Sequence, residues 1–180
     1  MATRRPPNLV FFFSDQQRWD TCGCYNQVMD ITPNLDEMAK EGVLFRKAFT
    51  CQPVCGPARS CLQTGKYPTE TGCFTNDRAL PQDEVTIAHR LRAAGYNTGY
   101  VGKWHLASYG EAQNYRTRPT PPERRGGWLD YWMAADVLEF TSHGYDGYVF
   151  DRDMNQVDFK GYRCDCVTDF ALDFLRPQRA

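Results

Sequence analysis

The chain has 180 residues, with 21 Lys or Arg, 22 Asp or Glu and a formal net charge of −1. This length allows one ordinary domain with a real hydrophobic core, or a piece of a larger domain. The balanced charge gives no bulk signal for nucleic acid or for an acidic surface. We therefore expect no nucleic-acid partner.

The first predicted element is a strand at residues 8–14, where the run Leu-Val-Phe-Phe-Phe suits a strand buried in a parallel sheet. Asp15 and Gln16 follow directly, at the carboxyl end of this strand. The run is far too short to span a bilayer, and no small-residue cleavage pattern follows it. We expect a soluble, cytoplasmic chain with no export signal and no membrane partner.

A helix is predicted next, with Thr32 as its cap, Pro33 at its first position and Gly42 at its end.

A second, short helix is predicted from Pro57, at the first helical position, to Gly65, which suits the residue after the last turn. This helix would hold Cys55 at its positive end, with the guanidinium of Arg59 one turn away. Such an arrangement favours a negatively charged ligand or transition state.

Residues 85–94 are expected to form a further helix that Gly95 ends, and residues 97–101 a strand. That strand runs into Gly-Lys-Trp-His, so Lys103 and His105 fall at its carboxyl end. The order of elements predicts an α/β fold with a mixed, mostly parallel sheet flanked by helices. Ligands of open α/β sheets bind outside the carboxyl ends of the strands, where Asp15, Lys103 and His105 would all lie.

The remaining chain is less regular. Residues 108–132 lack periodicity, residues 144–150 read as a turn into a short strand, and residues 165–175 carry the apolar stripe of a last helix that Pro177 ends. The irregular stretch contains a local basic cluster that we interpret as a solvated loop, with contact to an anionic substrate as the alternative: Arg116, Arg118, Arg124 and Arg125.

Eight cysteines raise the question of disulfides or zinc. Their C-x-C and C-x-x-x-C spacings do not repeat the paired C-x-x-C pattern of compact zinc modules. We expect most of them to be free, buried thiols, with a structural zinc site as the weaker alternative.

Several motifs together resemble the N-terminal part of the sulfatases, in the alkaline-phosphatase-like superfamily. The segment C-G-P-A-R-S-C-L-Q-T-G, beginning at Cys55, is similar to the sulfatase signature C-x-P-x-R followed by L-x-T-G. The segments S-D-Q-Q-R-W-D, T-P-N-L-D-E-M-A-K-E-G-V-L-F, G-K-W-H-L, H-G-Y-D-G-Y and T-D-F-A-L-D-F-L stand in the family's order. The resemblance covers nearly the whole chain.

The resemblance implies hydrolysis of sulfate esters, with Cys55 converted to formylglycine by a maturation enzyme. A divalent cation, Ca²⁺ first and Mg²⁺ or Mn²⁺ as alternatives, would be held by the modified Cys55, Asp15 and Gln16. Gln16 stands where many members carry an aspartate; its amide oxygen can still coordinate, with less negative charge at the metal.

By the same resemblance, three further residues take part in the chemistry. Arg59 would steady the modified Cys55, Lys103 would bind a sulfate oxygen, and His105 would bind substrate and exchange a proton. His89 and His143 lie outside these motifs, and we expect structural roles for both.

The family's other metal ligands come from a second half, and nothing after His105 fits those roles. We therefore expect residues 1–180 to be the N-terminal part of the catalytic domain, inactive alone. The expected substrate is a small-molecule or carbohydrate sulfate ester. Two alternatives stay open: a phosphonate monoester or phosphodiester hydrolase of the same superfamily, and a non-catalytic fragment in which Cys55 stays a thiol.

Overall fold

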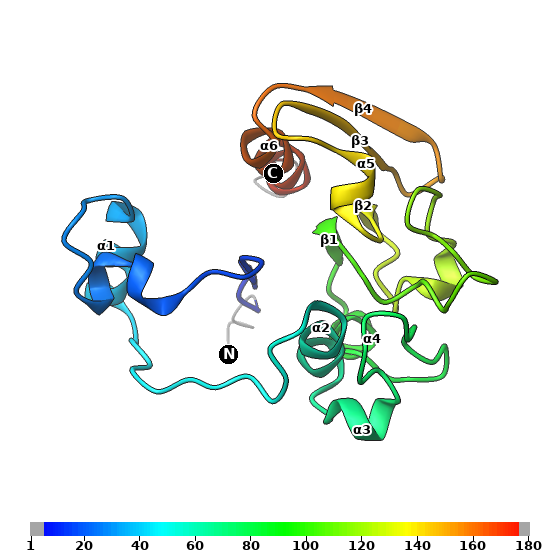
Figure 1. Cartoon of the computed structure of the whole chain (residues 1–180), viewed down its shortest axis with the longest axis horizontal. Coiled ribbons are helices and arrows are strands. Elements are labelled where there is room, and N and C mark those ends of the chain that lie inside the picture. The colour runs from blue at the N-terminus through cyan, green and yellow to red at the C-terminus, as the bar shows by residue number, and fades with distance from the viewer. Residues whose placement is uncertain (1–5, 177–180) are drawn as a thin grey trace, which may run out of the picture. The chain divides into compact units, whose positions relative to one another are not determined.

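The computed structural model describes residues 6–176, in two compact units that divide between Phe49 and Thr50. Figure 1 shows the course of the chain through both units.

The first unit is built from short helices: η1 (Trp19–Thr21), η2 (Gly23–Tyr25) and α1 (Pro33–Glu41). Helix α1 confirms the predicted helix, including Pro33 at its start and Gly42 after its end. Thr32 occupies the N-cap position but does not cap with its side chain. Its hydroxyl instead accepts a hydrogen bond from Gly23 N at 2.8 Å and donates one to Asp36 Oδ1 at 3.2 Å, which ties η2 to α1.

The predicted strand at residues 8–14 is not formed, which corrects the sequence-based expectation. Its five large apolar side chains, from Leu9 to Phe13, are exposed. All strands among the described residues belong to the second unit. A lone extended segment leaves its backbone N–H and C=O groups unpaired, so an apolar run without a neighbouring strand gains nothing from strand geometry.

The second unit contains a four-stranded sheet in the order β1-β2-β3-β4. Its strands are β1 (Gly99–Lys103), β2 (Tyr131–Ala135), β3 (Asp146–Phe150) and β4 (Gln156–Lys160). The β1–β2 pair is parallel, whereas β2–β3 and β3–β4 are antiparallel. A mixed sheet flanked by helices is therefore confirmed, but the described strands are not mostly parallel, because β3 and β4 form a hairpin instead of crossing over.

The helices of this unit are α2 (Cys55–Thr64), α3 (Pro68–Thr71), α4 (Ile87–Ala93), α5 (Leu138–Thr141) and α6 (Arg163–Leu175), with the 3-10 turn η3 (Pro122–Arg124). Pro57 was predicted to be the first residue of this helix. Helix α2 in fact starts at Cys55, so Pro57 is its third residue. Proline is tolerated there because the first-turn N–H groups have no partner within the helix. Gly65 ends α2 in the left-handed conformation, with φ 71°, as expected. Pro177 lies outside the described residues.

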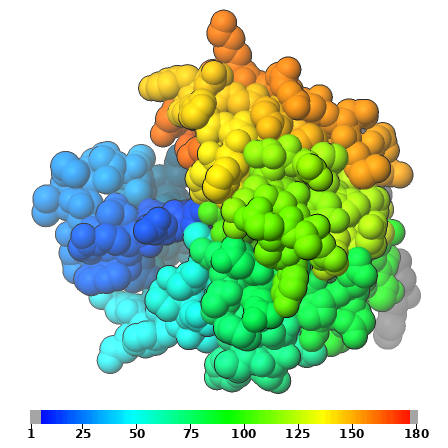
Figure 2. All heavy atoms as spheres, turned by 45° about the vertical axis from the view of Figure 1, so that its right-hand side comes forward, coloured from blue at the N-terminus to red at the C-terminus, as the bar shows by residue number. Residues whose placement is uncertain are grey.

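Aromatic rings form the hydrophobic core beside the carboxyl end of β1. Tyr100 of β1 stacks on Trp132 of β2 at 5.3 Å between centroids, and Trp104 packs edge-on against both rings. Helix α6 contacts β1 and β4, and places Phe174 so close to Gly99 that a Cβ there would lie 2.9 Å from the ring. The face of this unit seen in Figure 2 is closely covered by side chains, and Trp104 and Trp132 are fully buried beneath its surface. The carboxyl end of β1 is therefore held by a well-packed scaffold.

Arg125 corrects the interpretation of the basic cluster as a solvated loop. It is buried, donates hydrogen bonds to Thr120 O at 2.8 Å and to Arg152 O at 2.7 Å, and lies over the ring of Trp132. Burial lowers the pKa of its guanidinium. The residue therefore pins the irregular stretch to the core, a role that a charge count alone does not reveal.

None of the eight cysteines, which all lie within residues 6–176, forms a disulfide, and only Cys22 and Cys73 are buried. The expectation of mostly buried thiols was wrong, because Cys51 and Cys164 are exposed and the other four are only partly buried. Among residues 6–176, none of the helices is both long and apolar enough to cross a membrane.

Candidate active site

Cys55 is the first residue of α2 and is partly exposed. The next N–H, of Gly56, donates to Asn76 Oδ1 at 2.9 Å, which fixes the first turn. The sulfur therefore lies at the end of the helix where unpaired N–H groups leave a partial positive charge.

Lys103, the last residue of β1, brings a full positive charge to the same place. Its Nζ lies 3.7 Å from Cys55 Sγ and 3.0 Å from Glu139 Oε1, and only 9% of its side chain is exposed. Its carbonyl accepts hydrogen bonds from Arg59 Nη1 at 2.5 Å and from Tyr100 Oη at 2.6 Å. Arg59 is buried and so joins the second turn of α2 to the end of β1.

His105 completes the group two residues further on. It is buried, and its backbone adopts a left-handed conformation with φ 57°. A Cβ placed on Gly56 would lie 3.5 Å from the His105 carbonyl oxygen, so His105 borders the start of α2. Its Nδ1 is buried and has no hydrogen-bond partner among the described residues.

Burial, and then the positive charge of Lys103, lower the pKa of His105. The imidazole is therefore neutral at pH 7 and able to accept a proton. Cys55, Arg59, Lys103 and His105, all predicted from the sequence, lie together where α2 begins and β1 ends. A nearly buried ammonium beside a partly exposed thiol, at the positive end of α2, suits an anion.

The sequence matches the Sulfatase family model over residues 7–179. The chain belongs to the sulfatase family.

Among curated relatives of this sulfatase chain, an ulvan-active sulfatase from Formosa agariphila is 40% identical over 96% of the chain and 32% of its own length. The putative sulfatase YidJ from Bacteroides fragilis has a TM-score of 0.81 and 28% identity, over 99% of the chain and 42% of that structure. A solved protein in complex with its substrate D-glucosamine-2-N,6-O-disulfate has a TM-score of 0.71 and 30% identity, over 87% of the chain and 28% of that structure.

A phosphonate monoester hydrolase from Agrobacterium radiobacter is less similar, with a TM-score of 0.51 and 27% identity over 67% of the chain and 24% of that structure. The chain spans about a third of the length of the curated sulfatases that it matches over nearly its whole length.

The two other predicted site residues, Asp15 and Gln16, belong to the first unit. Both are exposed, on a bend after the apolar run, and Gln16 has a left-handed backbone with φ 60°. Within residues 6–176, no group of three or more His, Cys, Asp or Glu side chains is arranged to hold a metal ion. The grouping of Asp15 and Gln16 with Cys55 thus stays a prediction.

Sequence reasoning missed two carboxylates that support this sulfatase site. Glu139, in α5, forms the ion pair with Lys103. Asp136, directly after β2, is completely buried and accepts hydrogen bonds from Leu106 N, Ala107 N and Ser108 N at 2.9–3.0 Å, and from Ser108 Oγ at 2.5 Å. Had β2 been predicted, Asp136 would have fallen at the carboxyl end of a strand. A carboxylate at that position is a candidate site residue.

Asp136→Ala is expected to lower the free energy of unfolding of the second unit by about 3 kcal/mol, because three buried N–H groups and a hydroxyl lose their acceptor. Urea denaturation followed by tryptophan fluorescence measures this, since Trp104, Trp128 and Trp132 belong to that unit. Asp83→Ala, at an exposed carboxylate, is the matched control. Equal midpoints for the two variants would contradict the assigned role.

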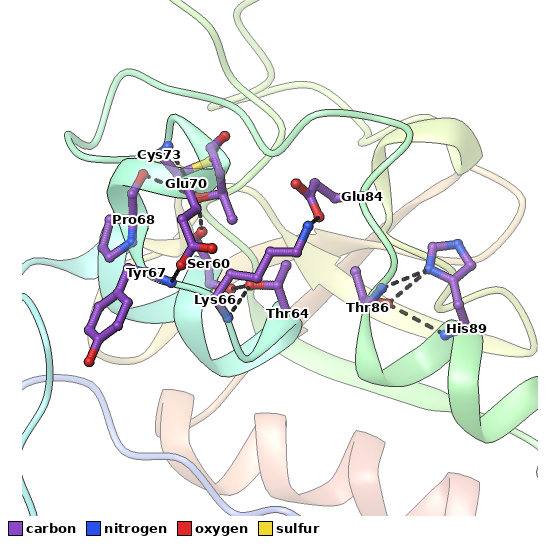
Figure 3. A network of polar contacts seen from close by, with 11 residues as sticks. Ser60, Thr64, Lys66, Tyr67, Pro68, Glu70, Cys73, Glu84, Thr86 and His89 are labelled. Atoms are coloured by element: carbon purple, nitrogen blue, oxygen red, sulfur yellow. Dashed lines mark hydrogen bonds and ion pairs between the residues drawn. The ribbon is translucent and has the colours of Figure 1, made fainter.

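His89 has a structural role, as expected. Its Nδ1 lies 3.1 Å from both the N and the Oγ1 of Thr86 and forms a capping box at the start of α4 (Figure 3). Thr86 Oγ1 also donates to Gly126 O at 2.5 Å, which ties α4 to the irregular stretch before β2.

Proposed function

We propose that the whole protein hydrolyses sulfate esters and that residues 1–180 are the N-terminal part of its catalytic domain. The observation that carries this proposal is the 3.7 Å approach of Lys103 Nζ to Cys55 Sγ at the start of α2, in a chain of the sulfatase family. An ester sulfate is a monoanion whose oxygens suit a cation at this distance from the attacking atom.

Each side chain at the site has a task that its surroundings support. Lys103 binds a sulfate oxygen as a compact cation, and the ion pair with Glu139 holds the ammonium in place. The neutral His105 accepts a proton from an attacking hydroxyl or returns one to the departing alcohol. Arg59, fixed on the carbonyl of Lys103, keeps the start of α2 and the end of β1 in register.

We propose that Cys55 acts after oxidation to formylglycine by a maturation enzyme. A hydrated aldehyde supplies two hydroxyls at one carbon, one to attack sulfur and one whose deprotonation releases the sulfate. A plain thiol or a serine lacks the second hydroxyl. The partial exposure of Cys55 supports access for substrate.

Asp15 and Gln16 would hold a divalent cation together with the modified Cys55. Carboxylate and amide oxygens are the donors that Ca²⁺ requires, and Mg²⁺ or Mn²⁺ could use the same set. Such an ion, when bound, polarises the oxygens of a sulfate group.

A sulfated carbohydrate is the proposed substrate class. Support comes from the ulvan-active relative and from the structural neighbour bound to a glucosamine disulfate. A phosphodiester or phosphonate is the alternative, but the corresponding neighbour is structurally less similar, and Lys103 and His105 favour sulfate.

Mass spectrometry of the peptide that spans Cys55 tests the modification directly. Tryptic cleavage after Lys47 and Arg59 gives a peptide with two cysteines, Cys51 and Cys55. In protein made beside a competent maturation enzyme, we expect this peptide to take up one iodoacetamide group, because formylglycine has no thiol, and to lose about 18 Da. The peptide with Cys61, residues 60–66, is the internal control. Uptake of two groups by the first peptide would refute the proposal.

Steady-state kinetics of the whole protein on an aryl sulfate and on a matched aryl phosphodiester separate the two chemical classes. We expect the larger kcat/KM for the sulfate ester. A strong preference for the phosphodiester would contradict the proposal and favour a phosphodiester or phosphonate monoester hydrolase.

A further inference from the structure

A second pair of thiols lies next to the candidate active site without belonging to it. The Sγ atoms of Cys51 and Cys61 are 2.9 Å apart, and the Cys51 thiol donates towards the Cys61 sulfur. Cys51 is exposed on the segment that leads into α2, and Cys61 lies in the last turns of α2, partly exposed. Both residues belong to the second unit, so their proximity follows from the packing within that unit.

The other two cysteines near this pair have different surroundings. Cys55 has its sulfur beside Lys103 Nζ. Cys73 is completely buried, with its Sγ 3.2 Å from Ala79 O, and it lies near Ser60 (Figure 3). Cys51, by contrast, is exposed and has the Cys61 sulfur at contact distance.

We propose that Cys51 and Cys61 form a redox-sensitive disulfide that closes a ring around Cys55. The oxidant is a small-molecule disulfide such as oxidised glutathione. The Cys51 thiolate attacks one sulfur of oxidised glutathione, the S–S bond of the glutathione disulfide breaks, and one glutathione thiolate leaves. The Cys61 thiolate then attacks Cys51 Sγ and expels the second glutathione. The two protein thiols lose two protons and two electrons, and the oxidised glutathione becomes two molecules of the thiol.

The order of these two attacks follows from the surroundings of the thiols. Burial and the neighbouring Cys51 raise the pKa of Cys61 to about 12. Cys61 is therefore a poor first nucleophile, whereas the exposed Cys51 meets the oxidant directly. Once Cys51 carries glutathione, its thiol no longer opposes ionisation of Cys61, and the second step becomes easier.

The disulfide would hold residues 51–54 against the last turns of α2. This segment enters the helix that begins with Cys55, so the oxidised ring would restrict the backbone on both sides of the reactive residue. The bond also removes Cys51 as a competing partner for Cys55, four residues away. The inference does not depend on the proposed function, because it involves neither modification of Cys55 nor turnover.

Equilibration of the full chain with reduced and oxidised glutathione, followed by tryptic mapping without reduction, tests the pair. Cleavage after Arg59 and Lys66 separates residues 48–59 from residues 60–66, so the disulfide links two peptides. We expect this linked pair, with a mass about 2 Da below the sum of the reduced peptides. The link should survive in Cys55→Ala and vanish in Cys51→Ser. Cys61→Ser should retain glutathione on Cys51.

The same titration in concentrated guanidinium distinguishes a folded pair from two cysteines that are merely close in sequence. We expect the folded chain to form the bond at a ratio of oxidised to reduced glutathione at least about tenfold lower than the denatured chain. Equal ratios in both states would overturn the proposal. So would a link that persists in Cys51→Ser, or one that requires Cys55.

Discussion

Cys55→Ala is expected to abolish sulfate-ester turnover by the whole protein, lowering kcat by at least about 10⁴-fold. The variant removes the attacking atom but keeps the first residue of α2 compatible with a helix, because alanine has the highest helix propensity. The measurement is release of the alcohol product from an aryl sulfate. Cys164→Ala, at an exposed thiol in the first turn of α6, is the matched control and should keep normal rates.

Cys55→Ser gives a sharper outcome for the same residue. A single hydroxyl can take the sulfate group and release the alcohol, but it has no second hydroxyl with which to expel the sulfate. We expect at most one equivalent of alcohol per protein and a protein mass increased by about 80 Da. Sustained turnover by unmodified Cys55→Ser, or near-normal rates for Cys55→Ala, would remove Cys55 from the mechanism.

Lys103→Ala is expected to lower kcat/KM by about 10²- to 10³-fold, because a fixed cation at the reacting group stabilises charge that develops in the transition state. The loss should be larger than usual for a surface lysine, since the ammonium is nearly buried and lies 3.7 Å from Cys55 Sγ. Lys160→Ala, at an exposed position in β4, controls for the loss of a charge.

Lys103→Arg separates charge from shape at this position. A guanidinium keeps the charge but is planar and larger, so it should not fit the space between Cys55 and Glu139 without loss. We expect activity between that of Lys103→Ala and that of the unmodified protein. If Lys103→Ala retained normal kcat/KM, the ammonium would have only a structural role at the end of β1.

Local patterns predicted much of the second unit. Helix α2, strand β1 and helix α6 were placed to within two residues at most boundaries, because capping residues and apolar periodicity act over a few neighbouring positions. Strands β2 and β4 were missed. The β4 segment, Gln-Val-Asp-Phe-Lys, does alternate polar and apolar residues, but it spans only five positions. The β2 segment has no such alternation and becomes a strand through its pairing with β1, which depends on residues about thirty positions away.

The same distinction explains the failure at residues 8–14. The apolar run has the composition of a buried strand, but a strand exists only with a neighbour, and the first unit contains none among its described residues. Composition indicates that a segment is able to form a strand, whereas pairing with a neighbouring strand decides whether the strand forms.

For the candidate site, the sequence alone determined the reactive residue types and the family. Two spacings are local and can be read without knowledge of the fold: that of Cys55, Pro57 and Arg59, and that of Lys103 and His105. Only the tertiary structure decided that Lys103, 48 residues from Cys55, lies beside its sulfur, and that Glu139 and Asp136 hold this arrangement. The physical reason is that distances between remote residues are set by the packing of α2 against the end of β1, and the sequence encodes that packing through side chains distributed over the whole unit.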